Sequence, residues 1–280
     1  MKHSSFDKIK AFVTLMRPET TLLAMVCVFV GGMVSESVYD PINLFLAVLV
    51  VFFATAGGMI LNDYLDLEVD KVSHPNRSVP SGKITAREAL YSATLFFLIA
   101  LAISFAINIL CFAIAIFSMF LLVLYEKFFK NKGIVGNMVV GFVSSISFVF
   151  GGAAVGKPQN SLIFSAIIFF IVTGREILMD VRDIEGDKLI RTTLPMQIGE
   201  KSATYVGCLL ISVTLFLTPL PFLWNILSIW YLLFIIPIDL IGIYAVFLSL
   251  RDIQSAGKTT ELIRIAAGLG LIGFIVGIVL

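Results

Sequence analysis

Residues 43–70 read NLFLAVLVVFFATAGGMILNDYLDLEVD, an apolar run that ends in a cluster of acidic side chains. A membrane-spanning helix needs about 20 mainly apolar residues, and the run up to Asn62 has that length. The run is continuously apolar, whereas the strands of a membrane barrel alternate between apolar and polar residues. The stretch therefore predicts a transmembrane helix with polar side chains at one membrane surface.

The same pattern recurs along the chain of 280 residues, which is 59% hydrophobic and only 14% charged. A soluble domain has roughly 25% charged residues, and the mean hydropathy here is +1.01. We therefore expect an all-α polytopic membrane protein, with residues 1–280 forming one bundle of nine transmembrane helices. The nine apolar runs are 20–37, 43–62, 88–106, 109–126, 134–156, 161–180, 202–219, 225–249 and 261–280.

The basic residues predict the orientation of this bundle. Of 20 Lys and Arg residues, only Lys157 lies outside if the N-terminus is inside, and positive charge favours the cytoplasmic side. We expect a cytoplasmic N-terminus in the cell membrane. Two long inside loops, at about 63–87 and 181–201, would form cytoplasmic caps. They hold most of the acidic residues, so we expect the active site at the cytoplasmic face.

Composition also excludes several classes of protein. The net charge is +1 and no tract is dense in Lys or Arg, so the chain lacks the basic surface that nucleic acid requires. Cys27, Cys111 and Cys208 lie in separate apolar segments, which excludes a disulfide framework and a CxxC metal site. Nothing in the sequence indicates an obligate protein partner; the bilayer itself is the expected surrounding.

The acidic cluster after the second run predicts a metal site. If the helix continues, Asn62, Asp66 and Asp70 recur every four residues, and Asp63 precedes Asp66 by three, so their oxygens share one face. Carboxylates this close repel one another unless a cation lies between them. Carboxylate and amide oxygens suit Mg²⁺ or Ca²⁺ better than zinc.

A second acidic stripe, REILMDVRDIEGD at 175–187, ends the sixth run. Glu176, Asp180, Asp183 and Asp187 again follow helical spacing. The two stripes lie at the inside ends of helices four apart, so they can face each other across the bundle and hold divalent ions between them. The alternative is solvated loop charge, which explains most acidic runs at membrane surfaces.

Basic residues beside both stripes indicate a strongly anionic substrate. Mg²⁺ is usually held by a few carboxylates together with substrate phosphates, while Arg and Lys bind the remaining oxygens. With almost no aqueous domain, a diphosphate on a lipid is the natural substrate, and an isoprenyl diphosphate fits. The alternative is that some of these residues are only positive-inside anchors. The basic residues on this side include Lys71, Arg77, Lys130, Arg175, Arg182 and Arg191.

The motifs resemble a known family, the UbiA superfamily of intramembrane prenyltransferases. The resemblance rests on NDYLDLEVD at 62–70, HPNRSVPSGKIT at 74–85, DVRDIEGD at 180–187 and TLP at 193–195. It also includes the pair Arg17 and Pro18, and a stretch containing Leu124, Tyr125, Lys130, Gly136 and Asn137. It covers nearly the whole chain and implies nine helices, Mg²⁺ dependence and prenyl transfer.

The resemblance also implies roles for particular residues. It makes Asp66 and Asp183 catalytic metal ligands and favours Arg77 and Lys130 as diphosphate-binding residues. Tyr125 lies at the inside end of the fourth run, where its ring can stabilise an allylic cation; the alternative is that it is only a packing group. The expected metal ligands are Asn62, Asp63, Asp66, Asp70, Asp180, Asp183 and Asp187.

Within the superfamily, the motifs most resemble those of archaeal digeranylgeranylglyceryl phosphate synthases. This implies transfer of geranylgeranyl from its diphosphate to the sn-2 hydroxyl of a lipid-phosphate acceptor, geranylgeranylglyceryl phosphate, in archaeal ether-lipid biosynthesis. Chlorophyll synthases share part of these sequence motifs, so a chlorophyll-type or aromatic quinone-precursor acceptor is an alternative. A divalent-cation transporter is the alternative from another class, but transport sites lie near the bilayer midplane.

Two further titratable residues have structural interpretations beside functional ones. His74 is favoured as a turn residue or a phosphate-side contact rather than a general base. Asp239 lies in the middle of the eighth run, two residues after Pro237. Carboxylates inside a membrane are often functional, but we favour a hydrogen-bonded structural role for Asp239.

Overall fold

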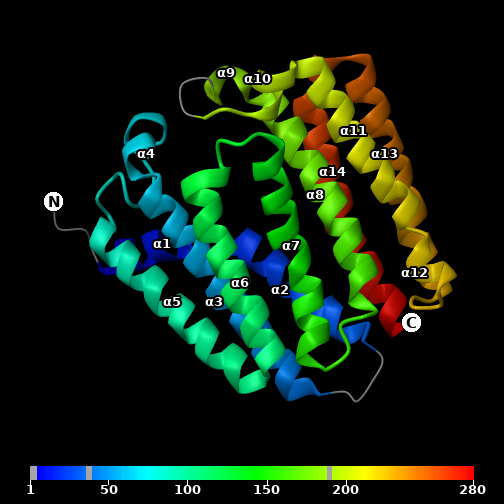
Figure 1. Ribbon diagram of the computed structural model, residues 1–280, viewed down its shortest axis with the longest axis horizontal. Coiled ribbons are helices and arrows are strands. Elements are labelled where there is room, and N and C mark those ends of the chain that lie inside the picture. Colours follow the sequence, from blue (N-terminus) through cyan, green and yellow to red (C-terminus); the bar gives the residue numbers. More distant parts are fainter. Residues whose placement is uncertain (1–4, 36–39, 188–190) are drawn as a thin grey trace.

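The chain folds into helices throughout the part that the structure describes, which is residues 5–35, 40–187 and 191–280 of a computed structural model (Figure 1). No strand occurs within these residues, which confirms the expected all-α class. The long helices are α2 (Pro18–Met33), α3 (Pro41–Leu65), α5 (Ala86–Ile107), α6 (Ile109–Leu124), α7 (Ile134–Ala154), α8 (Ser161–Arg182), α11 (Glu200–Leu217), α13 (Leu232–Arg251) and α14 (Ala256–Val279).

Short helices fill much of the space between the long ones. The N-terminal segment forms α1 (Ser5–Leu15), and the remaining short elements are α4 (Leu67–Ser73), the π-helix η1 (Tyr125–Phe129), α9 (Ile184–Asp187), α10 (Leu194–Ile198), α12 (Leu220–Leu223), η2 (Ile229–Tyr231) and η3 (Ile253–Ser255). The two long loops expected from the sequence are therefore partly helical.

Eight helices within the described residues are long and apolar enough to cross a membrane. The pair Phe6–Leu15 and Pro18–Met33 is bent by 50°, and the count becomes nine if this pair is one span. The bundle of eight or nine spans agrees with the expected nine apolar runs. The end of the first run, at 36–37, lies outside the described residues, as do Lys2 and Lys188, which entered the charge count.

Close backbone contact holds α2 against α7 in the centre of the bundle. A Cβ atom on Gly31 would lie 2.0 Å from the carbonyl oxygen of Phe148, and one on Gly151 would lie 2.0 Å from that of Val28. Only glycine permits this approach, as is usual where membrane helices pack closely. Beside this contact, the rings of Phe148, Phe164 and Phe274 pack together in a fully buried cluster.

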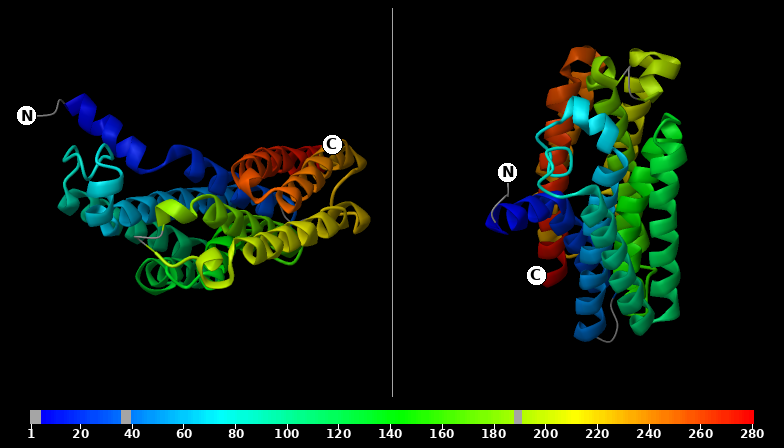
Figure 2. Two further views of the ribbon diagram at one scale, coloured as in Figure 1. Left: turned by 90° about the horizontal axis from the view of Figure 1, so that it is seen from above. Right: turned by 90° about the vertical axis from the view of Figure 1, so that its left-hand side faces the viewer.

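Helix α1 extends outward from the bundle beside the segment that follows α4 (Figure 2). Its Ala11 and Leu15 are buried in a cluster with Ile60 of α3 and with Val79 and Ile84 of the loop before α5. The opposite face of α1 is apolar and exposed, at Phe6, Ile9 and Val13. Helix α1 is therefore an amphipathic element docked over the acidic end of α3.

Candidate active site

Both acidic motifs begin in a long helix and continue past its end. Helix α3 ends at Leu65 and α8 ends at Arg182, so Asp66 and Asp183 are the residues that terminate them. The expected continuous helix is thus broken at these two positions. The four-residue spacing nevertheless survives, because the amides of Asp70 and Asp187 donate to the carbonyls of Asp66 and Asp183 at 2.8 and 3.0 Å.

Asp66 is bound by a lysine from another part of the bundle. The Lys130 ammonium donates to the two carboxylate oxygens of Asp66 at 2.7 and 2.6 Å and to Glu126 at 3.1 Å. The amide of Asn62 bridges the same carboxylates, at 3.2 Å to Asp66 and 2.8 Å to Glu126. One hydrogen-bonded cluster therefore joins the end of α3 to η1 and Lys130, and it brings together two residues that were predicted for different roles.

The two other carboxylates of the first motif are each held by an arginine. Arg17 donates to Asp63 at 2.7 Å and to the side-chain oxygen of Asn62 at 3.3 Å. Arg77 donates through one nitrogen to both oxygens of Asp70, at 2.9 and 2.7 Å. Asp63 and Asp70 are only 5% and 3% exposed. Buried carboxylates require such partners, so these two acids form fixed ion pairs with the surrounding loops.

The second motif has the same organisation. Asp180 accepts from the Asn137 amide at 2.9 Å and lies 3.2 Å from Arg191, which also binds Asp187 at 2.6 Å. Burial disfavours the charge of Arg191, but the nearby carboxylates of Asp187 and Asp180 more than offset this and raise its pKa. Arg191 therefore remains a cation between two motif acids.

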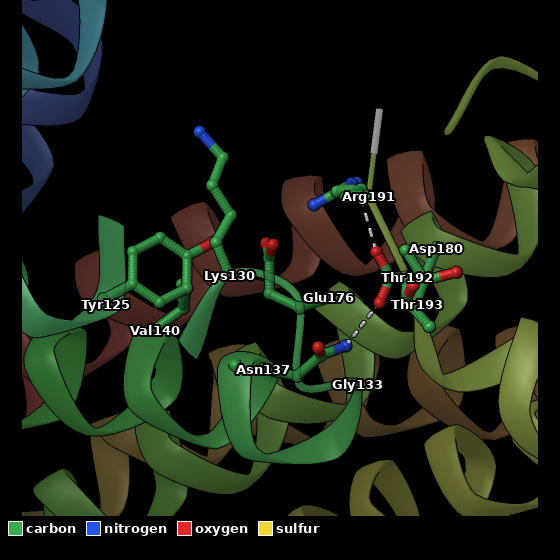
Figure 3. A pocket seen from close by; sticks show the side chains of 11 residues that line it. Tyr125, Lys130, Gly133, Asn137, Val140, Glu176, Asp180, Arg191, Thr192 and Thr193 are labelled. Carbon is green, nitrogen blue, oxygen red and sulfur yellow. Dashed lines mark hydrogen bonds and ion pairs between the residues drawn. The ribbon is translucent and has the colours of Figure 1, made fainter. Parts of the chain in front are cut away.

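A small recess of about 10 Å³ lies beside Asp180 of the second motif and against Lys130. Figure 3 shows Lys130, Glu176, Asp180 and Arg191 around it, with Tyr125 at one side. Lys130 thus contacts the first motif through Asp66 and lines the recess that contains Asp180 of the second. The amide of Lys130 donates to the carbonyl of Tyr125 five residues earlier, at 2.9 Å. This π-turn, a feature common at functional sites, brings both side chains to the recess.

The donor chemistry of the motifs fits Mg²⁺. Within the described residues, no group of three acidic, His or Cys side chains converges closely enough to hold a metal alone. Mg²⁺ does not require such a group, because it is commonly held by one or two carboxylates plus water and substrate phosphates. Each motif aspartate lies within hydrogen-bond distance of a Lys, Arg or Asn side chain, which a bound Mg²⁺ would have to displace from the carboxylate.

Besides Arg77, three of the predicted basic residues lie apart from the recess lining. Lys71 pairs with exposed Glu68 at 2.7 Å. Arg175 lies 3.2 Å from Glu176 and donates to the carbonyl of Thr260 at 3.4 Å. Arg182 binds its neighbour Asp183 through two bonds of 2.7 and 2.6 Å. Of these three, only Arg182 directly contacts one of the expected metal ligands.

Comparisons with known proteins agree with this arrangement. Residues 24–268 match the sequence profile of the UbiA prenyltransferase family. The chain belongs to this family. It is 36% identical to a digeranylgeranylglyceryl phosphate synthase from Methanococcus maripaludis, over 96% of this chain and 98% of that protein. The resemblance inferred from the motifs is therefore confirmed.

Solved structures of UbiA proteins have the same fold. A digeranylgeranylglyceryl phosphate synthase structure, 33% identical, superposes with a TM-score of 0.83 over 97% of this chain and 99% of that one. A UbiA homolog from Archaeoglobus fulgidus bound to GPP and Mg²⁺ is 20% identical and has a TM-score of 0.69, covering 96% of this chain and 100% of that one. This UbiA chain is thus a member of a prenyltransferase family, as expected, rather than of a transporter family.

The UbiA site contains partners that the sequence did not identify as site residues. Arg17 and Asn137 carried the resemblance, and Arg191 was among the basic residues, but their contacts with Asp63, Asp180 and Asp187 were not expected. Glu126 had no signal beyond its place between Tyr125 and Lys130. Each of these residues has a polar side chain that contacts a motif residue in the folded protein. Only the structure reveals these contacts.

The positions of His74 and Asp239 are compatible with the structural roles favoured from the sequence. His74 is exposed and terminates α4 with its backbone amide. Asp239 accepts from the hydroxyl of Thr218 at 3.1 and 2.9 Å. The carbonyl of Thr218 in turn accepts from buried Tyr231 at 2.8 Å. Asp239 therefore belongs to a network that joins α13 to the end of α11.

Proposed function

We propose that this chain transfers a geranylgeranyl group from geranylgeranyl diphosphate to the sn-2 hydroxyl of geranylgeranylglyceryl phosphate. The observation that carries the proposal is similarity along the whole chain to digeranylgeranylglyceryl phosphate synthases, in sequence and in fold. Sequence identity to the homolog bound to GPP and Mg²⁺ is only 20%. That homolog supports the class of prenyl donor, while the curated relatives support the acceptor.

The oxygen atoms of the motif side chains are the proposed Mg²⁺ ligands. Asp66, Asp183 and Asp187 are the most accessible of the carboxylates, with side chains 26%, 40% and 16% exposed. When bound, Mg²⁺ would neutralise charge on the departing diphosphate. The full proposed set is Asn62, Asp63, Asp66, Asp70, Asp180, Asp183 and Asp187.

The basic partners of these acids are the proposed diphosphate clamp. Lys130, Arg77 and Arg191 each bind a motif carboxylate in this structure. Each supplies N–H donors that suit phosphate oxygens equally well. We propose that these groups move from carboxylate to diphosphate when the substrate binds. Arg182 is a further candidate beside Asp183, whereas the contacts of Lys71 and Arg175 favour anchoring roles.

The proposed reaction follows from this arrangement. The bond between the first prenyl carbon and the diphosphate oxygen breaks, and its electron pair leaves with diphosphate. The sn-2 oxygen of the acceptor bonds to that carbon and releases its proton to the departing diphosphate or to a motif carboxylate. Tyr125 borders the recess, where its ring would stabilise the allylic cation. Such an electrophile lessens the need for a strong base.

The site is proposed to face the cytoplasm in the cell membrane. The support is the positive-inside distribution, since only Lys157 among the 20 Lys and Arg residues falls on the other side when nine spans are counted. A membrane-impermeant thiol reagent can test this in spheroplasts, using single cysteines placed at Lys132 and at Lys157. Labelling of the Lys157 position alone is expected. Labelling of the Lys132 position alone would reverse the orientation.

An acceptor panel tests the proposed function. Purified protein in nanodiscs would receive labelled geranylgeranyl diphosphate with geranylgeranylglyceryl phosphate, 4-hydroxybenzoate or a chlorophyllide. Product on the lipid phosphate alone is the expected result. Product on the aromatic or chlorophyll-type acceptor, with none on the lipid phosphate, would contradict the proposed acceptor and favour one of the alternatives.

A further inference from the structure

A second recess, of about 450 Å³, lies beside Asp63 of the first motif. It opens between α1, the end of α3 and the loop at 76–83. Basic side chains dominate its polar lining, with Lys10 and Arg17 contributed from one side and Arg77 and Lys83 from the other. Asp7 and Asp63 are the acids that line it. The recess is therefore a positively charged concavity next to the proposed metal motif, and the proposed mechanism assigns no ligand to its Lys10 and Lys83.

Two of the four cations in this recess are available for a ligand. Arg17 is paired with Asp63, and Arg77 with Asp70. Lys10 and Lys83 make no ion pair with any residue that the structure describes, and both are exposed. Two exposed ammonium groups in the same lining as two arginines suit a compact anion with several oxygen atoms, such as a phosphate monoester.

The wall formed by α1 is fixed rather than loosely attached. Ala11 and Leu15 are only 5% and 2% exposed. The buried hydroxyl of Ser78 donates to the carbonyl of Ala11 at 2.9 Å, which ties α1 to the loop on the opposite wall. Lys10 and Lys83 are thus carried on two segments that are held at a set separation, so the recess is a feature of the fold.

A lipid-facing surface borders the recess on α1. Phe6, Ile9 and Val13 are 75%, 64% and 48% exposed and recur at helical spacing, so they form one apolar stripe. Lys10 lies between this stripe and the recess. An apolar stripe of this kind places a helix at the boundary between head groups and acyl chains. A ligand bound here would have its hydrocarbon chain in lipid and its phosphate in the recess.

Hydrogen bonds connect the recess to the proposed catalytic acid. Arg17, at the recess, binds Asn62 at 3.3 Å, and Asn62 binds Asp66 at 3.2 Å. A phosphate near Arg17 is therefore separated from Asp66 by one side chain. In a glycerol phosphate the carbon with the sn-2 hydroxyl is next to the carbon that carries the phosphate. The accepting hydroxyl must accordingly lie close to the bound phosphate, as this arrangement allows.

We propose that this recess binds the phosphate monoester of the acceptor lipid, with Lys10 and Lys83 as its specificity-determining residues. The inference rests on the proposed function, since it assigns a place to the acceptor of that reaction. It also separates two anions within one enzyme: the diphosphate lies between the two acidic motifs, and the acceptor phosphate lies between α1 and the loop at 76–83. The same chemistry is offered by bilayer phospholipid head groups, so the test must separate these sources.

The test is the double variant K10Q/K83Q in nanodiscs of zwitterionic lipid, with Michaelis constants measured for both substrates. Each charge-assisted bond to phosphate is worth about tenfold or more in affinity. We expect the KM for geranylgeranylglyceryl phosphate to rise at least about tenfold while the KM for geranylgeranyl diphosphate stays unchanged. K8Q is the matched control, because Lys8 lies on the same helix outside the recess and binds Glu88; it should leave both constants unchanged.

Different results would overturn the recess assignment and the proposed function. An unchanged acceptor KM in the double variant overturns the recess assignment while leaving the proposed function intact. A defect that appears only in nanodiscs of anionic lipid also overturns it, because it would assign the recess to bilayer head groups. Wild-type protein that does not use geranylgeranylglyceryl phosphate at all contradicts the proposed function itself, and the recess assignment falls with it.

Discussion

The Lys130 ammonium lies 2.7 and 2.6 Å from the two carboxylate oxygens of Asp66, and it also lines the recess that contains Asp180. One side chain thereby touches the first acidic motif and borders the second. A lysine in this position neutralises Asp66 when no substrate is present and can bind a phosphate oxygen when substrate arrives. The two motifs thus meet at Lys130.

Lys130→Gln should therefore weaken binding of the prenyl diphosphate. Losing one charge-assisted bond predicts an increase of about tenfold or more in the KM for geranylgeranyl diphosphate. Steady-state kinetics with the acceptor saturating measure this constant. Lys132→Gln is the matched control, because Lys132 is exposed and lies outside the recess lining. Equal effects of the two variants would show that Lys130 acts only as one of several surface charges.

Asp66→Asn and Asp183→Asn should each reduce turnover by about 100-fold or more, because a carboxylate that holds a catalytic metal must be charged. Thermal unfolding in detergent should show that both proteins remain folded. Glu68→Gln and Glu185→Gln are the controls, since each removes an acid two residues after a motif Asp. Near-normal turnover of either Asn variant would remove that aspartate from the site.

Arg77→Ala and Lys71→Ala distinguish a substrate-binding residue from an anchor within one loop. Arg77 binds buried Asp70, whereas Lys71 pairs with exposed Glu68. We expect the dissociation constant for a non-hydrolysable prenyl diphosphate to rise about tenfold in Arg77→Ala and to stay unchanged in Lys71→Ala. Isothermal titration calorimetry gives both values. An effect of Arg77→Ala on the acceptor KM alone would instead show that Arg77, which lines the second recess, binds the acceptor and not the diphosphate.

Asp239 should be structural rather than catalytic. Asp239→Asn keeps an oxygen that accepts from Thr218, so turnover and melting temperature should stay near the wild-type values. Asp239→Ala leaves the Thr218 hydroxyl without this acceptor and should destabilise the fold by about 1–2 kcal/mol, with kcat of the folded protein unchanged. Thermal melts and kinetics on the same preparations measure these quantities. A large loss of kcat in a fully folded Asn variant would give Asp239 a functional role.

Much of the fold could be predicted because burial in lipid leaves a strong compositional pattern. Each expected apolar run corresponds to a long helix, and the run at 43–62 lies within α3. The ends were less predictable. The helices stop at Asp66 and Asp183, whose side chains pair with Lys130 and Arg182. No periodic pattern in the sequence marks such a break.

The acidic motifs were also predictable, but their partners were not. Arg17 is 46 residues from Asp63, and Lys130 is 64 residues from Asp66. Contacts over such separations depend on how helices pack, which the local sequence does not reveal. Arg175 and Lys71 show the converse, because they lie beside the motifs in sequence and yet contact neither recess. Their role in substrate binding stays a prediction.

The most direct test of the account is transfer of labelled geranylgeranyl from its diphosphate to geranylgeranylglyceryl phosphate by the purified protein, with Mg²⁺ and with a chelator. The account predicts a doubly prenylated glycerol phosphate with Mg²⁺, none with chelator, and recovery when Mg²⁺ is restored. Folded protein that forms no such product with Mg²⁺, or that forms it equally well in chelator, would contradict the account.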